Sequence, residues 1–180
     1  PLILMKYKQA LTINFKNSEV AEFKHIELGI KHAIPFGVSG KLAFNINAGT
    51  FINGEKAYFM DYKHFGGNRT VFSNMGAARF LDYYAFRTTD PYFGGLFHYQ
   101  FRKFLFTQLP GLRFSGIREN IFFNYLKTES SPHYWELGYS LDNLFRMFRL
   151  EMGAGFENKT YGSGGFRFGI ATFISINIDE

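Results

Sequence analysis

The residues that could support catalysis or metal binding are few and lie far apart in the sequence. The histidines are His25, His32, His64, His98 and His133. None has the His-x-x-x-His or His-Glu-x-x-His spacing that places two metal ligands on one helical face. The one local group of a hydroxyl, an imidazole and a carboxylate is Ser130-Ser131-Pro132-His133 beside Glu129, and Ser and Pro are typical of a turn. We therefore expect no catalytic residue, no metal site and no enzymatic activity.

Glycine pairs could form a phosphate-binding loop, but no Lys-Ser or Lys-Thr follows any of them. The pairs are Gly66-Gly67, Gly94-Gly95 and Gly164-Gly165. They fit turns and a tightly packed wall better, so no cofactor is expected.

Charged side chains recur at alternate positions beside apolar ones, which indicates β-strands with two different faces. Phe166, Phe168 and Ile170 share one face of such a strand, whereas Arg167 and Gly169 share the other. The pattern predicts eight strands, over residues 2–15, 22–35, 40–53, 92–106, 112–127, 134–141, 146–157 and 164–177. The phase slips within 112–127, which suggests a β-bulge there.

The predicted polar face carries both signs of charge. Its members are Lys31, Arg102, Arg149, Arg167, Glu27, Glu119, Glu136, Glu151 and Glu157. Because buried charges must be paired or hydrated, we expect a hydrated interior with cross-strand ion pairs, such as Arg149 or Arg167 with Glu151 or Glu136.

The composition favours an antiparallel transmembrane β-barrel of the bacterial outer membrane. The chain has 24 Phe and 11 Tyr in 180 residues, yet its mean hydropathy is only −0.13. A barrel strand needs one apolar residue in two, so the average stays near neutral while the lipid face is hydrophobic. Most predicted strands also exceed the length of soluble strands. A soluble β-sandwich is the alternative, and it would need a second sheet to cover every Phe-rich face.

Three further features bear on the environment. The absence of cysteine agrees with an envelope protein that passes through an oxidising compartment. The net charge of +5 is spread along the chain rather than clustered, so nucleic acid is not an expected partner. Aromatic residues expected at strand ends could form interfacial girdles, namely Tyr7, Tyr92, Tyr125, Tyr134 and Trp135.

Residues 54–90 interrupt the strand pattern and form the longest connection in the chain. Long loops in compact folds are usually functional or disordered, and the aromatic content here argues against disorder. We expect this loop to fold into the barrel interior or over its mouth.

The loop also carries a family resemblance. Phe80-Leu81-Asp82-Tyr83-Tyr84, Phe65-Gly66-Gly67-Asn68 and Leu109-Pro110-Gly111-Leu112-Arg113 resemble Bacteroidetes-type outer-membrane proteins. Members join an N-terminal carboxypeptidase-regulatory-like domain to a C-terminal barrel similar to the bacterial surface antigen or BamA-type assembly factors. This resemblance implies that the chain is the C-terminal half of a barrel of about sixteen strands, which would explain why it begins inside a strand; closure by eight strands is the alternative.

In that superfamily the Arg of a Val-Arg-Gly-Phe/Tyr loop motif contacts acidic wall residues. The matching segment here is Ala78-Arg79-Phe80-Leu81, which keeps the Arg but not the Val or the Gly. The resemblance thus implies a loop latch formed by Arg79 and Asp82 with acids of the wall. The candidate acids are Glu119, Glu136 and Glu151.

The resemblance further implies a protein that assists the assembly, insertion or translocation of other outer-membrane or surface proteins. Expected partners are the lipid bilayer, lipopolysaccharide, and client barrels or subunits of an envelope complex. A porin-like or receptor barrel, in which the loop gates solute passage, and a structural subunit of the Gram-negative envelope remain alternatives.

Overall fold

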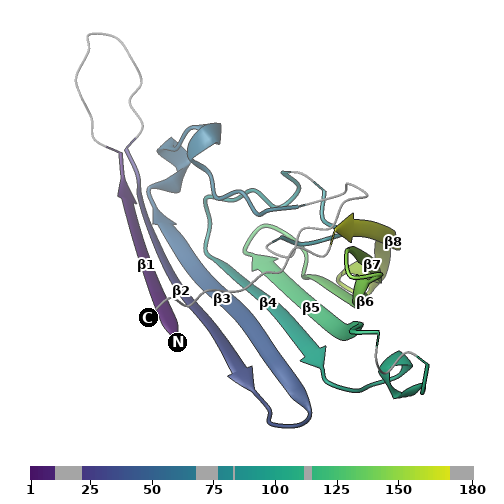
Figure 1. Cartoon of the computed structure of the whole chain (residues 1–180). Helices are drawn as coiled ribbons and strands as arrows, with labels where there is room; N and C mark the ends of the chain where they lie inside the picture. The colour runs from purple at the N-terminus through teal and green to yellow at the C-terminus, as the bar shows by residue number, and fades with distance from the viewer. Residues whose placement is uncertain (11–21, 68–76, 83, 112–114, 171–180) are drawn as a thin grey trace.

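The computed structural model describes residues 1–10, 22–67, 77–82, 84–111 and 115–170 and forms one antiparallel sheet of eight strands. The strands are β1 (Leu2–Gln9), β2 (Lys24–Pro35), β3 (Gly40–Ile52), β4 (Tyr92–Phe101), β5 (Arg118–Thr128), β6 (Tyr134–Leu144), β7 (Phe148–Glu157) and β8 (Thr160–Ile170). Strand order follows the chain, and the curved sheet leaves one concave face (Figure 1). The all-β prediction and the number of strands are confirmed.

The sheet is open rather than closed. Within the described part of the chain, β1 and β8 each pair with a single neighbour and not with each other. These eight strands therefore do not close into a barrel by themselves.

The register sorts side chains as the alternation predicts. Glu151 lies opposite Ser140 on β6 and Arg167 on β8, so these polar residues share the concave face. The convex face is apolar and open, as at Ile3 (71% exposed) and Phe166 (74% exposed). This is the inverse of a soluble sheet, because carboxylates are buried while large apolar side chains are not.

The predicted bulge in β5 is wrong. The strand begins only at Arg118 and pairs with β4 without a register shift, while residues 112–114 lie outside the described residues. The phase slip in the sequence therefore reflects the connection that precedes the strand. Register shifts occur instead between Leu141 and Leu144 and between Gly155 and Phe156.

The aromatic girdle is corrected in part. Tyr92 and Tyr134 lie on the concave face and are buried, because their hydroxyls donate hydrogen bonds to Glu27 and Glu136 respectively. Tyr7 is exposed, and Tyr125 and Trp135 are half-buried; all three lie on the convex face.

The connection from β3 to β4 crosses the concave side of the sheet (Figure 1). It contains two short 3-10 segments, η1 (Gly54–Lys56) and η2 (Phe59–Asp61), and a third, η3 (Phe106–Gln108), follows β4. None of the helical segments in the described ranges has the length and apolar character needed to span a membrane. Two isolated bridges, Lys63 with Thr88 and Gly67 with Ala78, join parts of this connection to one another.

Close packing on the concave face generates a test of the fold. A Cβ atom at Gly138 would lie 2.1 Å from Cζ of Phe122 and 2.5 Å from the backbone oxygen of Met152. We expect Gly138→Ala to destabilise the protein by about 1–3 kcal/mol, because the β6–β7 backbone must shift. Chemical unfolding followed by circular dichroism measures this change. The matched control is Gly165→Ala on β8, which has open space and should change stability little; equal losses in both variants would contradict the packing.

Candidate functional site

The site is built around two consecutive loop residues, Arg79 and Phe80, whose backbone groups are bound by side chains of the sheet. Glu136 on β6 accepts the Arg79 N–H at 2.7 and 2.9 Å and the Phe80 N–H at 2.9 Å. The Arg79 carbonyl accepts a hydrogen bond from Nη1 of Arg167 at 2.6 Å, and the Phe80 carbonyl accepts one from Oγ of Ser163 at 2.9 Å. All four backbone groups are satisfied, which allows a non-strand segment to be buried.

Glu136 is the centre of this arrangement and is fully buried. Besides the two loop amides, it accepts a hydrogen bond from the Tyr134 hydroxyl at 2.7 Å and one from the Asn124 side-chain amide. Burial of a carboxylate is costly unless donors replace its hydration shell. The loop amides supply part of that shell, so Glu136 and the loop depend on each other.

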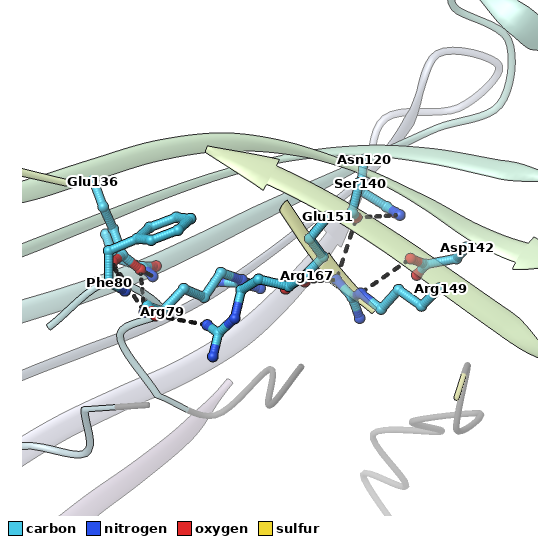
Figure 2. A network of polar contacts seen from close by, with 10 residues as sticks. Arg79, Phe80, Asn120, Glu136, Ser140, Asp142, Arg149, Glu151 and Arg167 are labelled. Carbon is cyan, nitrogen blue, oxygen red and sulfur yellow. Dashed lines mark hydrogen bonds and ion pairs between the residues drawn. The ribbon is translucent and has the colours of Figure 1, made fainter. Parts of the chain in front are cut away.

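The Arg79 guanidinium continues the network toward β7. Its Nε lies 3.2 Å from Oε1 of Glu151, and its central carbon lies 3.7 Å from the centre of the Phe122 ring. Glu151 also forms an ion pair with Arg149, whose Nη2 lies 2.7 Å from its Oε1. Nε of Arg149 lies 3.2 Å from Oδ1 of Asp142 (Figure 2). Burial lowers the pKa of Arg79 and the Glu151 carboxylate opposes that shift; an arginine keeps its proton under such conditions.

The charges of the network balance. Three cations, Arg79, Arg149 and Arg167, face three carboxylates, Glu136, Asp142 and Glu151 (Figure 2). A neutral sum is the condition under which buried ions are tolerated.

Glycines on β7 make room for the Phe80 ring. A Cβ atom at Gly153 would lie 3.0 Å from Cε2 of Phe80, and one at Gly155 would lie 3.1 Å from its Cβ. The guanidinium of Arg167 lies 5.8 Å from the same ring. The alternate glycines of β7 therefore act as the receptor for Phe80, and we call Arg79, Phe80, Glu136, Glu151, Ser163 and Arg167 the loop latch.

Apolar contacts extend the latch along the loop. Ala78, Leu81 and Phe86 form a buried cluster with Leu126 and Tyr134 of the wall, and Phe65 packs against it. The loop is thus held by a small core as well as by polar contacts.

A second attachment, which sequence reasoning missed, holds the other part of the loop. Nζ of Lys63 contacts Glu27 on β2, and the Tyr92 hydroxyl donates to the same carboxylate at 2.5 Å. Lys6 on β1 lies 3.5 Å from Glu27, and His25 lies 2.9 Å from the Tyr92 hydroxyl. The inward phase of Glu27 was visible in the sequence, but no spacing rule connects it to Lys63.

The predicted latch residues are therefore brought together only in part. Arg79 meets Glu136 and Glu151 as the resemblance implied. Asp82 is exposed and its carbonyl accepts the Ala85 N–H at 3.4 Å; its role in the latch stays a prediction.

Glu119 belongs to a different structure, which corrects its predicted place. It pairs in register with Leu141 and so lies on the convex side, not on the concave face. Its carboxylate accepts the backbone N–H groups of the four residues from Phe104 to Thr107 at 2.9–3.2 Å and the Tyr139 hydroxyl at 2.5 Å. Glu119 therefore fixes the connection between β4 and β5.

The contacts of the latch position the loop against the sheet. No group of three His, Asp or Glu residues in the described ranges could hold a metal ion. Beside the latch, a cavity of about 260 Å³ lies between the loop and β1–β6, with Lys6, Glu27, Asn124 and Leu81 in its lining.

The class defined by these features is an open, all-β antiparallel sheet whose charged concave face binds its own long loop. The chain belongs to a family of unknown function, DUF5686, whose C-terminal domain matches residues 1–141. The matched range contains Arg79 and Glu136 and ends before Glu151. The match shows neither a carboxypeptidase-regulatory-like domain nor a BamA-like family in this chain. No curated protein and no solved structure gives a match.

The central position of Glu136 generates a prediction. Glu136→Gln keeps the shape but removes the charge and leaves one acceptor oxygen for several donors. We expect the latch to weaken by about 3 kcal/mol, because buried donors lose their partner. Hydrogen exchange of the Arg79 and Phe80 amides measures the loss. Glu157→Gln, at an exposed position on β7, is the matched control, and unchanged protection in Glu136→Gln would contradict the central role.

Proposed function

We propose that this chain forms part of the wall of an outer-membrane β-barrel, with the concave face toward the lumen and the convex face toward lipid. The observation that carries the proposal is the inversion of the sheet. A network of buried charges lies on one face, while Ile3, Met152 and Phe166 are exposed on the other. Water cannot favour that arrangement, whereas a hydrocarbon environment outside and a hydrated lumen inside would stabilise it.

The proposed barrel needs strands beyond these eight. Unpaired backbone groups at the β1 and β8 edges would be costly in lipid, where only closed sheets and helices satisfy them. Further strands of the same protein or a second copy would complete the wall. The resemblance to barrels of about sixteen strands favours further strands of the same protein over a second copy.

Within that barrel, we propose a role in the assembly, insertion or translocation of other outer-membrane proteins. The loop latch supports this role, because it holds a long loop in the lumen by contacts to β6, β7 and β8, close to the β8 edge. Client strands would enter at a weak seam between β8 and the strand that completes the wall. Lipopolysaccharide and the bilayer are the environment, and client barrels or envelope subunits are the partners.

A porin-like or receptor barrel is the second candidate. The charged and amide side chains in the mixed lining of the cavity beside the loop favour it, since a loop across a hydrated lumen can also gate small solutes. A structural subunit of an envelope complex would need neither the latch nor the cavity.

The membrane proposal predicts a large effect of charge on the convex face. Met152, in the middle of β7, is 49% exposed. We expect Met152→Arg to destabilise the protein by about 2–4 kcal/mol in a bilayer, because the side chain would enter hydrocarbon. In a soluble protein the same surface change costs no more than about 0.5 kcal/mol. Urea unfolding of the reconstituted protein separates the two, and Met60→Arg in the exposed loop is the control. Equal stability of both variants would contradict the proposal.

The assembly role predicts a phenotype for the latch. We expect cells carrying Arg79→Ala to hold less of other barrel proteins in the outer membrane, because the loop loses its ion pair with Glu151 and its contact with Phe122. Quantitative proteomics of outer-membrane fractions measures this. Arg87→Ala, an exposed position in the same loop, is the matched control. Normal levels of other barrels, together with altered single-channel conductance of the purified protein, would favour the porin-like candidate instead.

A further inference from the structure

Three connections lie together at one end of the sheet and form what we call the turn rim. They are the β2–β3 turn (36–39), the β4–β5 connection (102–111 and 115–117) and the β6–β7 turn (145–147). The Arg102 N–H donates to the Ser39 carbonyl at 3.2 Å, and the Asn143 side-chain amide donates to the Gly116 carbonyl at 2.9 Å. These contacts join the connections into one continuous surface.

The turn rim exposes large apolar side chains where turns are ordinarily polar. They are Phe36, Val38, Leu105, Phe106, Leu109, Phe145 and Met147. Val38 is 83% exposed and Phe145 is 89% exposed. The segment that carries Leu105 and Phe106 is fixed by Glu119, because both backbone amides donate to its carboxylate. This part of the apolar surface is therefore held in place by the fold.

Within the described part of the chain, the charges of the turn rim have one sign. Arg102, Lys103 and Arg146 are exposed on it, and Lys41 is exposed beside it at the start of β3. Of the described carboxylates near the turn rim, Glu119 is buried against backbone amides and Asp142 pairs with Arg149.

The opposite end of the sheet is different, because exposed carboxylates stand beside its cations. They are Glu22, Glu55, Asp82, Glu129 and Glu157. A negatively charged surface would thus be attracted to the turn rim and not to the other end.

We propose that the turn rim binds the head groups of anionic phospholipids at one surface of the bilayer. Arg102, Lys103 and Arg146 contact lipid phosphates, while Val38 and Phe145 enter the interfacial layer. Apolar and aromatic side chains beside cations are the combination that favours this layer, and each cation near an anionic surface strengthens binding. The inference rests on the proposed membrane location, and it adds a lipid partner and an orientation: the turn rim faces the phospholipid leaflet and the loop latch lies toward the other side.

The experiment measures lipid selectivity of the full protein reconstituted into phosphatidylcholine bilayers. Spin-labelled phosphatidylglycerol and spin-labelled phosphatidylcholine are added in turn, and the fraction of immobilised label gives their relative association constant. We expect phosphatidylglycerol to be preferred about fivefold, the effect of one cation contact, at low salt. The preference should decrease as salt is added.

Two triple variants that each remove three positive charges show which end of the sheet causes the lipid preference. The triple variant Arg102→Gln, Lys103→Gln and Arg146→Gln should bring the ratio to about one, since the phosphate contacts are lost. The control triple variant Lys56→Gln, Arg87→Gln and Lys159→Gln changes exposed cations at the opposite end and should keep the preference. None of these residues belongs to the loop latch, so folding of the site is preserved in both.

The outcomes separate this inference from the proposed function. A protein that cannot be reconstituted into bilayers would overturn both. A reconstituted protein without selectivity, or one in which both triple variants lose it equally, would overturn the lipid inference alone. An unchanged preference in the turn-rim variant, together with crosslinking from position 145 to an acidic protein, would assign the turn rim to a protein partner and would likewise reject the inference.

Discussion

The structure depends on one constraint: charges buried on the concave face need ion-pair partners or hydrogen-bond donors, many of them from distant parts of the chain. Glu136 shows it most clearly, since its carboxylate takes the amides of Arg79 and Phe80 together with donors from β5 and β6. Without the loop this buried anion would lose the two backbone donors, and without the anion the loop would leave amides unpaired. The wall and its loop therefore form one unit, and Lys63 with Glu27 repeats the principle at the other half of the sheet.

The number of strands and their faces were predictable from the sequence, because a period of two is a local property that needs no knowledge of partners. Phe166, Arg167 and Phe168 alternate in the sequence as they do in the sheet. Strand ends were less accessible. The phase slip before Arg118 looked like a bulge, since the sequence does not reveal where backbone pairing starts.

The contacts of Arg79 in the latch were predictable only because a family resemblance linked this residue to acidic residues of the wall. Arg79 and its acids are separated by 57 and 72 residues, and no spacing rule covers such separations. Glu119 has the residue type and a strand position like the others, yet it lies on the convex side, where nearby amides surround it. Tyr92 and Tyr134 were predicted to lie at the membrane interface for the same reason: the sequence does not show that their hydroxyls donate hydrogen bonds to carboxylates on the concave face.

The consecutive pairing of all eight strands has a consequence for the order of folding. Apart from β3 and β4, which are separated by the long connection, each strand meets a neighbour that is close in sequence, so most hairpins can form with little loss of chain entropy. The hydrogen bond from Arg167 to Arg79 spans 88 residues and needs β8, the last of these strands. Docking of Arg79 and Phe80 is accordingly complete only when the whole sheet exists, so a seated loop is a marker of a finished wall.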